Sequence, residues 1–197
     1  MGREKKINDV SVVIDAAMEI IEELGYKEVS TRRIASRLRI SPMTLYNYYK
    51  NRDAILKGII KKGFDELWAG LQEKIDACCS ANNPLRVYLV LADHMLDFGM
   101  ARPNLYRFLF TSAFSPLPLD ETIADRYHGV SKALLSRISA LPNRQDILND
   151  IFMFQVLMNS LVLSVLDHKA DMTADRYPSL IARAFDGLLL RDRLYLD

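Results

Sequence analysis

The sequence predicts an all-α fold in two parts, a small N-terminal domain of three helices and a larger helical domain, with about nine helices in total. Apolar residues recur at helical spacing along nearly the whole chain, and no segment shows the alternation of a strand. Most of the 8 glycines and 7 prolines stand where these helices would end. With 197 residues, half of them hydrophobic, the chain is long enough for one or two real cores.

The expected domains are residues 1–50 and 51–197, connected by a long helix over 51–77. Ser30, Ser41 and Asn51 are the predicted N-caps of the second, third and fourth helices, and Pro42 suits a first helical position. Gly25 ends the first helix. The expected helices cover residues 8–24, 30–38, 41–49, 51–77, 85–101, 103–114, 120–140, 144–168 and 175–191.

Charge is distributed unevenly along the chain. Residues 1–62 hold 13 Lys/Arg and 8 Asp/Glu, a balance of +5, whereas residues 63–197 hold 13 and 17, a balance of −4. The basic N-terminal part and the acidic remainder of the chain indicate that only the N-terminal part binds a polyanion.

The segment from Val29 to Leu56 has the pattern of a DNA-binding helix-turn-helix, with two short helices that meet at a tight turn. With Leu45 and Tyr49 on the core face, a rotation of ~100° per residue points Asn47 outward, with Met43 and Thr44 near it. Short polar groups on such a ridge suit the edges of bases in a major groove.

This segment resembles the TetR family of bacterial regulators, over about residues 8–62. The matching residues are Thr31, Arg32, Ile34, Ala35, Leu38, Ile40, Ser41, Thr44, Leu45, Tyr46, Tyr48, Tyr49 and Arg52. The likeness implies that the second helix contacts phosphates and bases at its start and that the third is a recognition helix beginning at Pro42. It further implies that Tyr46 and Arg52 hold phosphates and that Tyr48 reaches a base or the backbone. The candidate DNA-binding residues are therefore Thr31, Arg32, Pro42, Met43, Thr44, Tyr46, Asn47, Tyr48 and Arg52.

One residue departs from the family pattern. Arg39 stands in the turn where the family usually has glycine. If the backbone there is left-handed, a residue other than glycine costs about 1 kcal/mol. Arg39 is then either a further phosphate contact or a solvated side chain.

The second half of the chain favours binding and dimerisation. Gln155 and Asn159 lie four apart on an otherwise apolar helix, and such amides need partners, either in a small molecule or across a dimer interface. The candidate ligand-binding residues are Phe98, Tyr106, Phe110, Gln155 and Asn159. The last two expected helices carry more apolar surface than one protomer needs, and the resemblance implies that they pair with those of a second subunit.

Other classes of protein have weaker support in the sequence. We find no catalytic constellation, and no cofactor or metal ion is expected, because the three histidines are far apart and no glycine-rich phosphate loop exists. The adjacent Cys78 and Cys79 favour a reducing compartment, with a redox sensor as the less favoured alternative. A charged N-terminus and the interrupted apolar run from Ile151 to Leu166 predict a cytoplasmic protein with a buried helix rather than a membrane span.

The sequence thus predicts a homodimeric repressor that binds a palindromic operator in double-stranded DNA and dissociates when a small, largely apolar effector binds. The alternatives are a DNA-binding or architectural protein without a ligand and, less favoured, a helical enzyme. The sequence of a helical enzyme would be expected to contain a nucleophile, which we do not find. A DNA-binding protein without a ligand would leave about two-thirds of the chain without a use.

Overall fold

The computed structural model describes residues 10–78, 86–112, 144–169 and 172–189. These residues are helical or irregular, and they include no strand. Their contacts divide the chain into two compact units. The first unit comprises residues 1–66 and 102–123, and the second comprises residues 67–101 and 124–197. The domain boundary predicted at residue 50 separates DNA binding from ligand binding and dimerisation, and it stays a prediction.

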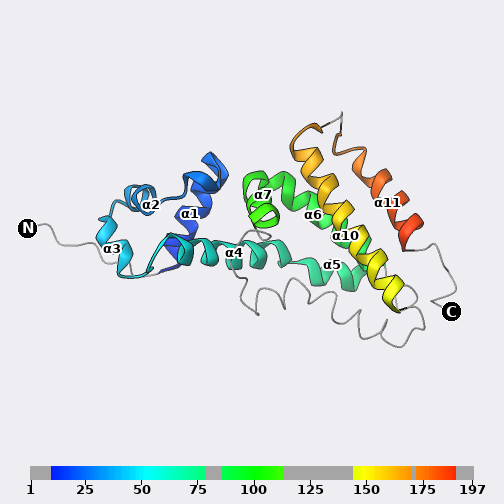
Figure 1. Ribbon diagram of the computed structural model, residues 1–197, viewed down its shortest axis with the longest axis horizontal. Coiled ribbons are helices and arrows are strands. Elements are labelled where there is room, and N and C mark those ends of the chain that lie inside the picture. Colours follow the sequence, from blue (N-terminus) through cyan, green and yellow to red (C-terminus); the bar gives the residue numbers. More distant parts are fainter. Residues whose placement is uncertain (1–9, 79–85, 113–143, 170–171, 190–197) are drawn as a thin grey trace, which may run out of the picture. The chain divides into compact units, whose positions relative to one another are not determined.

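The first unit contains α1 (Ser11–Leu24), η1 (Tyr26–Glu28), α2 (Thr31–Leu38), α3 (Pro42–Tyr46), most of α4 (Arg52–Trp68) and α7 (Pro103–Ser112). Helix α1 contacts η1, α2 and α7, although α7 follows it by some eighty residues (Figure 1). The core side chains are nearly all apolar. They include Val13, Ala17, Ile20, Ile21, Ile34, Leu45, Ile55, Ile59, Leu105 and Leu109.

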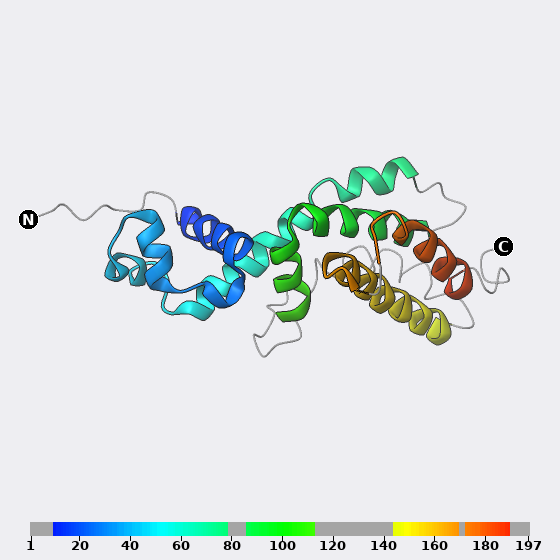
Figure 2. The same ribbon diagram turned by 90° about the horizontal axis from the view of Figure 1, so that it is seen from above.

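The second unit contains α5 (Leu71–Cys78), α6 (Val87–Ala101), α10 (Arg144–Leu166) and α11 (Tyr177–Leu188). Helix α6 lies between α5 on one side and α10 and α11 on the other (Figure 2). Phe154 of α10 makes edge-on ring contacts with Tyr88 of α6 and Phe185 of α11. These aromatic contacts join three helices into one core.

Two expected helices end earlier than the sequence predicted. The fourth helix was expected to continue to residue 77, but α4 ends at Trp68 and α5 begins at Leu71. Gly70 lies between them with a φ of 74°, a left-handed conformation that glycine adopts without a Cβ clash. The third helix was expected to reach Tyr49, but α3 ends at Tyr46, and a turn leads to α4.

The other described helices confirm the expected pattern to within a few residues at each end. The expected helix over residues 120–140 lies outside the described residues. The predicted N-caps are confirmed: the side chains of Ser30, Ser41 and Asn51 accept hydrogen bonds from the backbone N–H groups of Arg33 (3.2 Å), Thr44 (3.1 Å) and Ala54 (2.9 Å).

Candidate nucleic-acid interface

The turn between α2 and α3 has a left-handed backbone, a conformation that glycine adopts without strain. Arg39 has a φ of 54° and a ψ of 44° and is exposed. Its N–H donates to the carbonyl of Ser36 (3.1 Å), and the N–H of Ile40 donates to that of Ala35 (3.0 Å). These bonds end α2 and direct the chain into α3, although the conformation is strained for arginine.

Behind the turn, Ile34, Ala35 and Leu45 are almost completely buried. The small side chain of Ala35 allows α2 and α3 to approach closely. The prediction that Leu45 lies on the core face is confirmed, and this core fixes the orientation of the outer face of α3.

That outer face carries exposed side chains. Met43 is 69% exposed and Tyr46 is 49% exposed, and Pro42 and Asn47 are also exposed. On α2, Arg32 is exposed and Thr31 is half-buried, as is Tyr48 after α3. The Tyr46 hydroxyl lies 3.3 Å from the Thr31 hydroxyl, so a hydrogen bond joins the start of α2 to the end of α3 at this surface.

The prediction that Thr44 lies on the outward ridge is wrong. Its side chain is only 5% exposed, and its hydroxyl lies 2.9 Å from that of Ser41. Because Ser41 caps α3 and also bonds to Thr44, the first turn of the helix draws this hydroxyl inward. Thr44 is thus placed to shape the start of α3.

The arginines of α2 differ in their partners. Arg33 pairs with Glu28 at 2.8 Å, and Arg37 pairs with Glu19 and Glu23 of α1. Hydrogen bonding to Arg37 lowers the pKa of Glu23, and the same bond raises the pKa of Arg37. Within the described part of the chain, Arg32 forms no ion pair, so its charge is the one on α2 best placed to meet a polyanion.

Arg52 has a structural role that the sequence did not indicate. Its Nε donates to the carbonyl of Val29 at 2.7 Å, and its Nη2 donates to that of Tyr26 at 3.2 Å. The start of α4 is thereby tied to the segment that leads into α2. A role for Arg52 in holding phosphate stays a prediction, and two of its five N–H donors are already in use.

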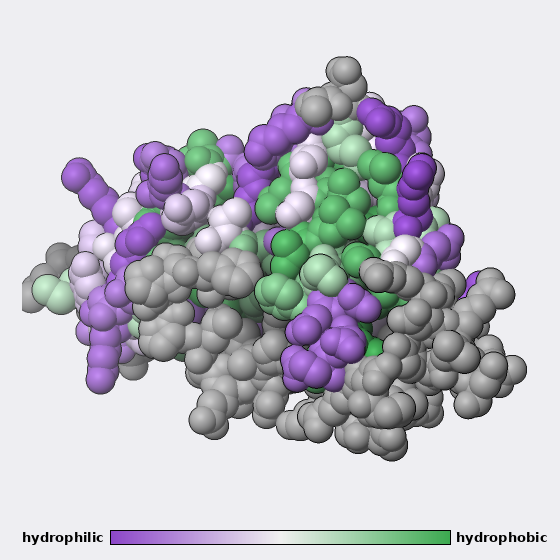
Figure 3. Space-filling view, turned by 45° about the vertical axis from the view of Figure 1, so that its right-hand side comes forward, coloured by the Kyte–Doolittle hydropathy of each residue, from purple (hydrophilic) through white to green (hydrophobic). Residues whose placement is uncertain are grey.

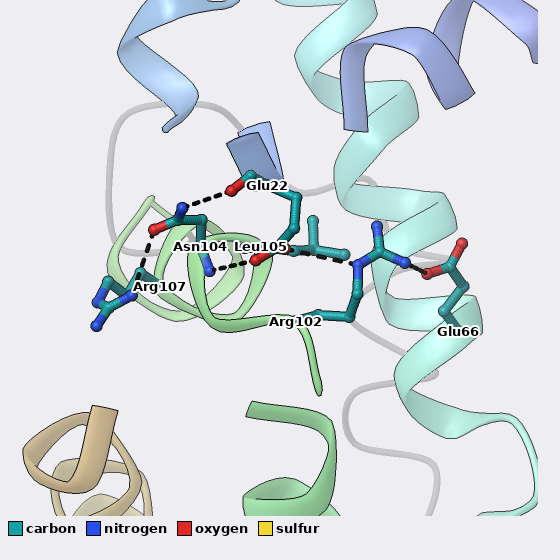
Figure 4. A network of polar contacts seen from close by, with 6 residues as sticks. All are labelled: Glu22, Glu66, Arg102, Asn104, Leu105 and Arg107. Carbon is teal, nitrogen blue, oxygen red and sulfur yellow. Dashed lines mark hydrogen bonds and ion pairs between the residues drawn. The ribbon is translucent and has the colours of Figure 1, made fainter. Parts of the chain in front are cut away.

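A polar network joins α1, α4 and the start of α7 in the first unit (Figure 4). The Glu22 carboxylate accepts hydrogen bonds from the N–H groups of Asn104 (3.1 Å) and Leu105 (3.2 Å). It also lies 3.5 Å from Arg102 Nε, while Arg102 Nη1 donates to Glu66 at 3.0 Å. Helix α7 is therefore capped by a side chain from a distant helix, which no local spacing in the sequence could have indicated.

The candidate ligand-binding residues fall into two groups. Tyr106 and Phe110 are buried in the first unit, with ring centroids 4.5 Å apart. Phe98, Gln155 and Asn159 are half-buried in the second unit. Each group is compatible with a polar or aromatic contact to a small molecule, and their joint role stays a prediction.

Helix α10 exposes an apolar face. Phe152, Met153, Val156 and Leu157 are between 37% and 65% exposed, and a broad hydrophobic area is visible in Figure 3. The stretch Gln145–Leu166 is long and apolar enough to cross a membrane by length and composition alone, with 28% of its most apolar window buried. Core helices of soluble proteins meet the same criterion. Within the described residues we find no group of three side chains that could hold a metal ion.

Comparison with known proteins gives a consistent result for the N-terminal part. Residues 13–59 match the family described as "Bacterial regulatory proteins, tetR family". The chain is 32% identical over 82 residues to the fatty acid metabolism regulator protein of Bacillus subtilis, covering 42% of this chain and 41% of that protein. It is 43% identical over 47 residues to the class D tetracycline repressor of Escherichia coli, covering 24% and 22%. The aligned parts thus span well under half the length of these relatives.

The likeness in fold extends over nearly the whole chain. A Rhodococcus sp. RHA1 protein of unknown function superposes with a TM-score of 0.70 at 15% identity, covering 95% of each chain. A TetR variant from Acinetobacter baumannii AYE, crystallised with minocycline, superposes with a TM-score of 0.67 at 16% identity, covering 97% of this chain and 100% of that one. At such low identity these structures establish the fold. The match over residues 13–59 therefore assigns the helix-turn-helix part of the chain to that family, and the structures show that the rest of the chain has the same fold as theirs.

Proposed function

We propose that this protein is a one-component transcriptional repressor of the cytoplasm. A homodimer binds a palindromic operator through its helix-turn-helix, and a small, largely apolar effector releases it. The exposed ridge of α3, held by a buried core and capped by Ser41, is the observation on which this proposal rests.

Several features support DNA binding by this ridge. A major groove accommodates one helix, and Met43 and Asn47 are free of the core and available to base edges. Arg32 adds a positive charge at the start of α2, next to Thr31 and Tyr46. The relatives that match this part of the chain are named as regulators and repressors rather than as enzymes.

The apolar face of α10 supports the proposed dimerisation. An exposed surface of this kind requires cover, and a second copy of the same face supplies it in an isologous interface. Two-fold symmetry also matches a palindrome, in which recognition helices lie about 34 Å apart.

Effector binding is supported by the apolar composition of the second unit and by the minocycline complex of a structural neighbour. The candidates for contact are Phe98, Gln155 and Asn159 in the second unit and Tyr106 and Phe110 in the first. Helix α4 begins in the first unit and ends in the second, so a change at its end can reach the helix-turn-helix. An effector shifts DNA affinity only as far as it binds the two conformations differently.

Selection of binding sites from random duplex DNA tests the proposal. We expect the wild type to select a palindrome. Arg32→Ala and Met43→Ala should change the selected sequence, with effects of about 1–3 kcal/mol per base contact. Arg33→Ala is the matched control, because Arg33 is paired with Glu28 and should leave the preference unchanged. Failure to select any sequence would refute the proposal, and binding that no screened molecule weakens would favour an architectural role.

A further inference from the structure

His94 of α6 is a buried histidine with an asymmetric environment. The residue is only 9% exposed, and its Nε2 lies 2.5 Å from the backbone oxygen of Leu67. A carbonyl oxygen only accepts hydrogen bonds, so Nε2 carries a proton and donates it. This bond fixes both the orientation of the ring and its tautomer.

The other ring nitrogen, Nδ1, is buried and has no hydrogen-bond partner among the described residues. A neutral imidazole that carries its proton on Nε2 presents a lone pair at Nδ1. Buried polar atoms in native proteins are almost always partnered. Tyr177, in the same unit, follows that rule, because its buried hydroxyl donates to the carbonyl of Ala92 at 3.0 Å.

We infer that Nδ1 of His94 binds a small molecule by accepting a hydrogen bond from a neutral donor, such as a hydroxyl group. The neighbouring residues on α6 are apolar, which favours an apolar ligand. Leu91 and Met95, also on α6, are buried and apolar, and Phe98 lies one helical turn beyond His94 and is half-buried. The ligand is therefore an apolar molecule with a single alcohol or phenol group. This inference rests on the proposed function for the idea that such a ligand is an effector.

The same imidazole ring connects the ligand to α4. Leu67 lies in the last turn of α4, two residues before the break at Ala69–Gly70, where the helix leaves carbonyl groups without intrahelical partners. A hydrogen bond accepted at Nδ1 polarises the ring and strengthens the bond that Nε2 donates. A ligand bound at Nδ1 thus changes the strength of the hydrogen bond between His94 Nε2 and the Leu67 carbonyl at the end of α4.

Binding of three molecules of similar shape to the full-length protein tests the inference. Phenol has a donor, anisole has only an acceptor, and toluene has neither. We expect saturable binding by calorimetry, with phenol about two- to tenfold tighter than the others, as one neutral hydrogen bond would give. In ¹⁵N-labelled protein, phenol but not toluene should shift the Nδ1 resonance of His94. Equal affinity for the three molecules, no saturable binding of phenol at millimolar concentration, or an unmoved Nδ1 resonance would each overturn the inference.

Substitution assigns the effect to one nitrogen. His94→Gln places an amide nitrogen near the position of Nε2 and so keeps a donor for Leu67, but it provides no acceptor at Nδ1. The preference for phenol should disappear in this variant and should persist in His168→Gln, which changes an exposed histidine of the same unit. A preference that survives His94→Gln contradicts the inference. These measurements need no DNA, so a protein that binds phenol through His94 yet selects no operator would refute the proposed function alone.

Discussion

Glu22 and Asn104 are joined by two hydrogen bonds that run in opposite directions. The Glu22 carboxylate accepts from the Asn104 backbone N–H at 3.1 Å, and the Asn104 side-chain amide donates to the Glu22 backbone oxygen at 2.7 Å. The residues are 82 positions apart, so the end of α1 and the start of α7 are held together by tertiary structure alone. Arg102 extends this link to Glu66 of α4.

Removal of the Glu22 carboxylate should destabilise the protein. Glu22→Ala leaves the N–H groups of Asn104 and Leu105 and the Arg102 guanidinium without their acceptor, and we expect a loss of about 1–3 kcal/mol in the free energy of unfolding. Urea denaturation followed by circular dichroism measures this loss. Glu19→Ala is the control on the same helix: its pairing with Arg37 is exposed to solvent, so its removal should change the free energy of unfolding much less. Equal losses in the two variants would show that the cap has no special role.

The left-handed turn predicts a stabilising substitution. Arg39→Gly should raise the free energy of unfolding by about 1 kcal/mol, because glycine adopts a φ of 54° without a Cβ clash. Arg39→Ala is the matched control, since it removes the guanidinium but keeps the Cβ, and its stability should equal that of the wild type. If Arg39→Ala weakens DNA binding, the arginine is also a phosphate contact. A gain in stability from both variants would instead indicate that the side chain, not the backbone, is unfavourable.

Close packing of α4 against α7 depends on Gly63. A Cβ added there would lie 2.9 Å from Leu109 Cδ2 and 3.1 Å from Cδ1. Gly63→Ala should therefore displace the Leu109 side chain, at a packing cost of about 1–3 kcal/mol that the higher helix propensity of alanine reduces by about 1 kcal/mol. The double variant Gly63→Ala/Leu109→Ala should lose less than the sum of the two single losses, as a double-mutant cycle of thermal stabilities would show. Additive losses would mean that the two side chains do not compete for space.

The comparison of Arg52 with Arg32 separates structure from DNA contact. Arg52→Ala should reduce stability, by about 1–3 kcal/mol, because it removes hydrogen bonds from a charged donor to Val29 and Tyr26. Arg32→Ala should leave stability within about 0.5 kcal/mol of the wild type and change DNA binding instead. Unfolding curves and operator titrations of both variants, at the same salt concentration, provide the measurements. If Arg52→Ala weakens DNA binding with no loss of stability, phosphate contact is its main role.

The sequence predicted well those features that depend on neighbouring residues. The caps at Ser30, Ser41 and Asn51 follow from local chemistry and are confirmed, whereas the left-handed turn at Arg39 was a conditional expectation that came from the family resemblance. The break at Gly70 was missed because the apolar pattern continues on both sides of it.

Long-range contacts could not be predicted from neighbouring residues. Thr44 was assigned to the outer face from helical angle alone, since an ideal helix cannot show that Ser41 draws its hydroxyl inward. The roles of Glu22, Arg52 and His94 depend on partners at least 23 residues away. Their residue types alone are equally compatible with a solvated surface.

The proposed dimer interface on α10 can be tested at positions that do not support the protomer's own core. Phe185 is unsuitable because it is 2% exposed and packs against Phe154, so a charge there would disrupt the fold. Phe152 is 65% exposed and Val156 is 50% exposed. Phe152→Glu and Val156→Glu should therefore yield folded monomers, because a carboxylate at the centre of an apolar interface cannot be solvated.

Light scattering across micromolar concentrations measures the mass of each variant, and circular dichroism verifies that it is folded. Met100→Glu is the matched control, since Met100 is 54% exposed but lies on α6, outside the apolar face of α10. We expect Met100→Glu to remain dimeric and to bind the selected palindrome, and the two α10 variants to lose high affinity for the full site while retaining weak affinity for half of it. A monomeric wild type, or α10 variants that remain dimeric, would place the interface elsewhere and leave the apolar face of α10 to another partner.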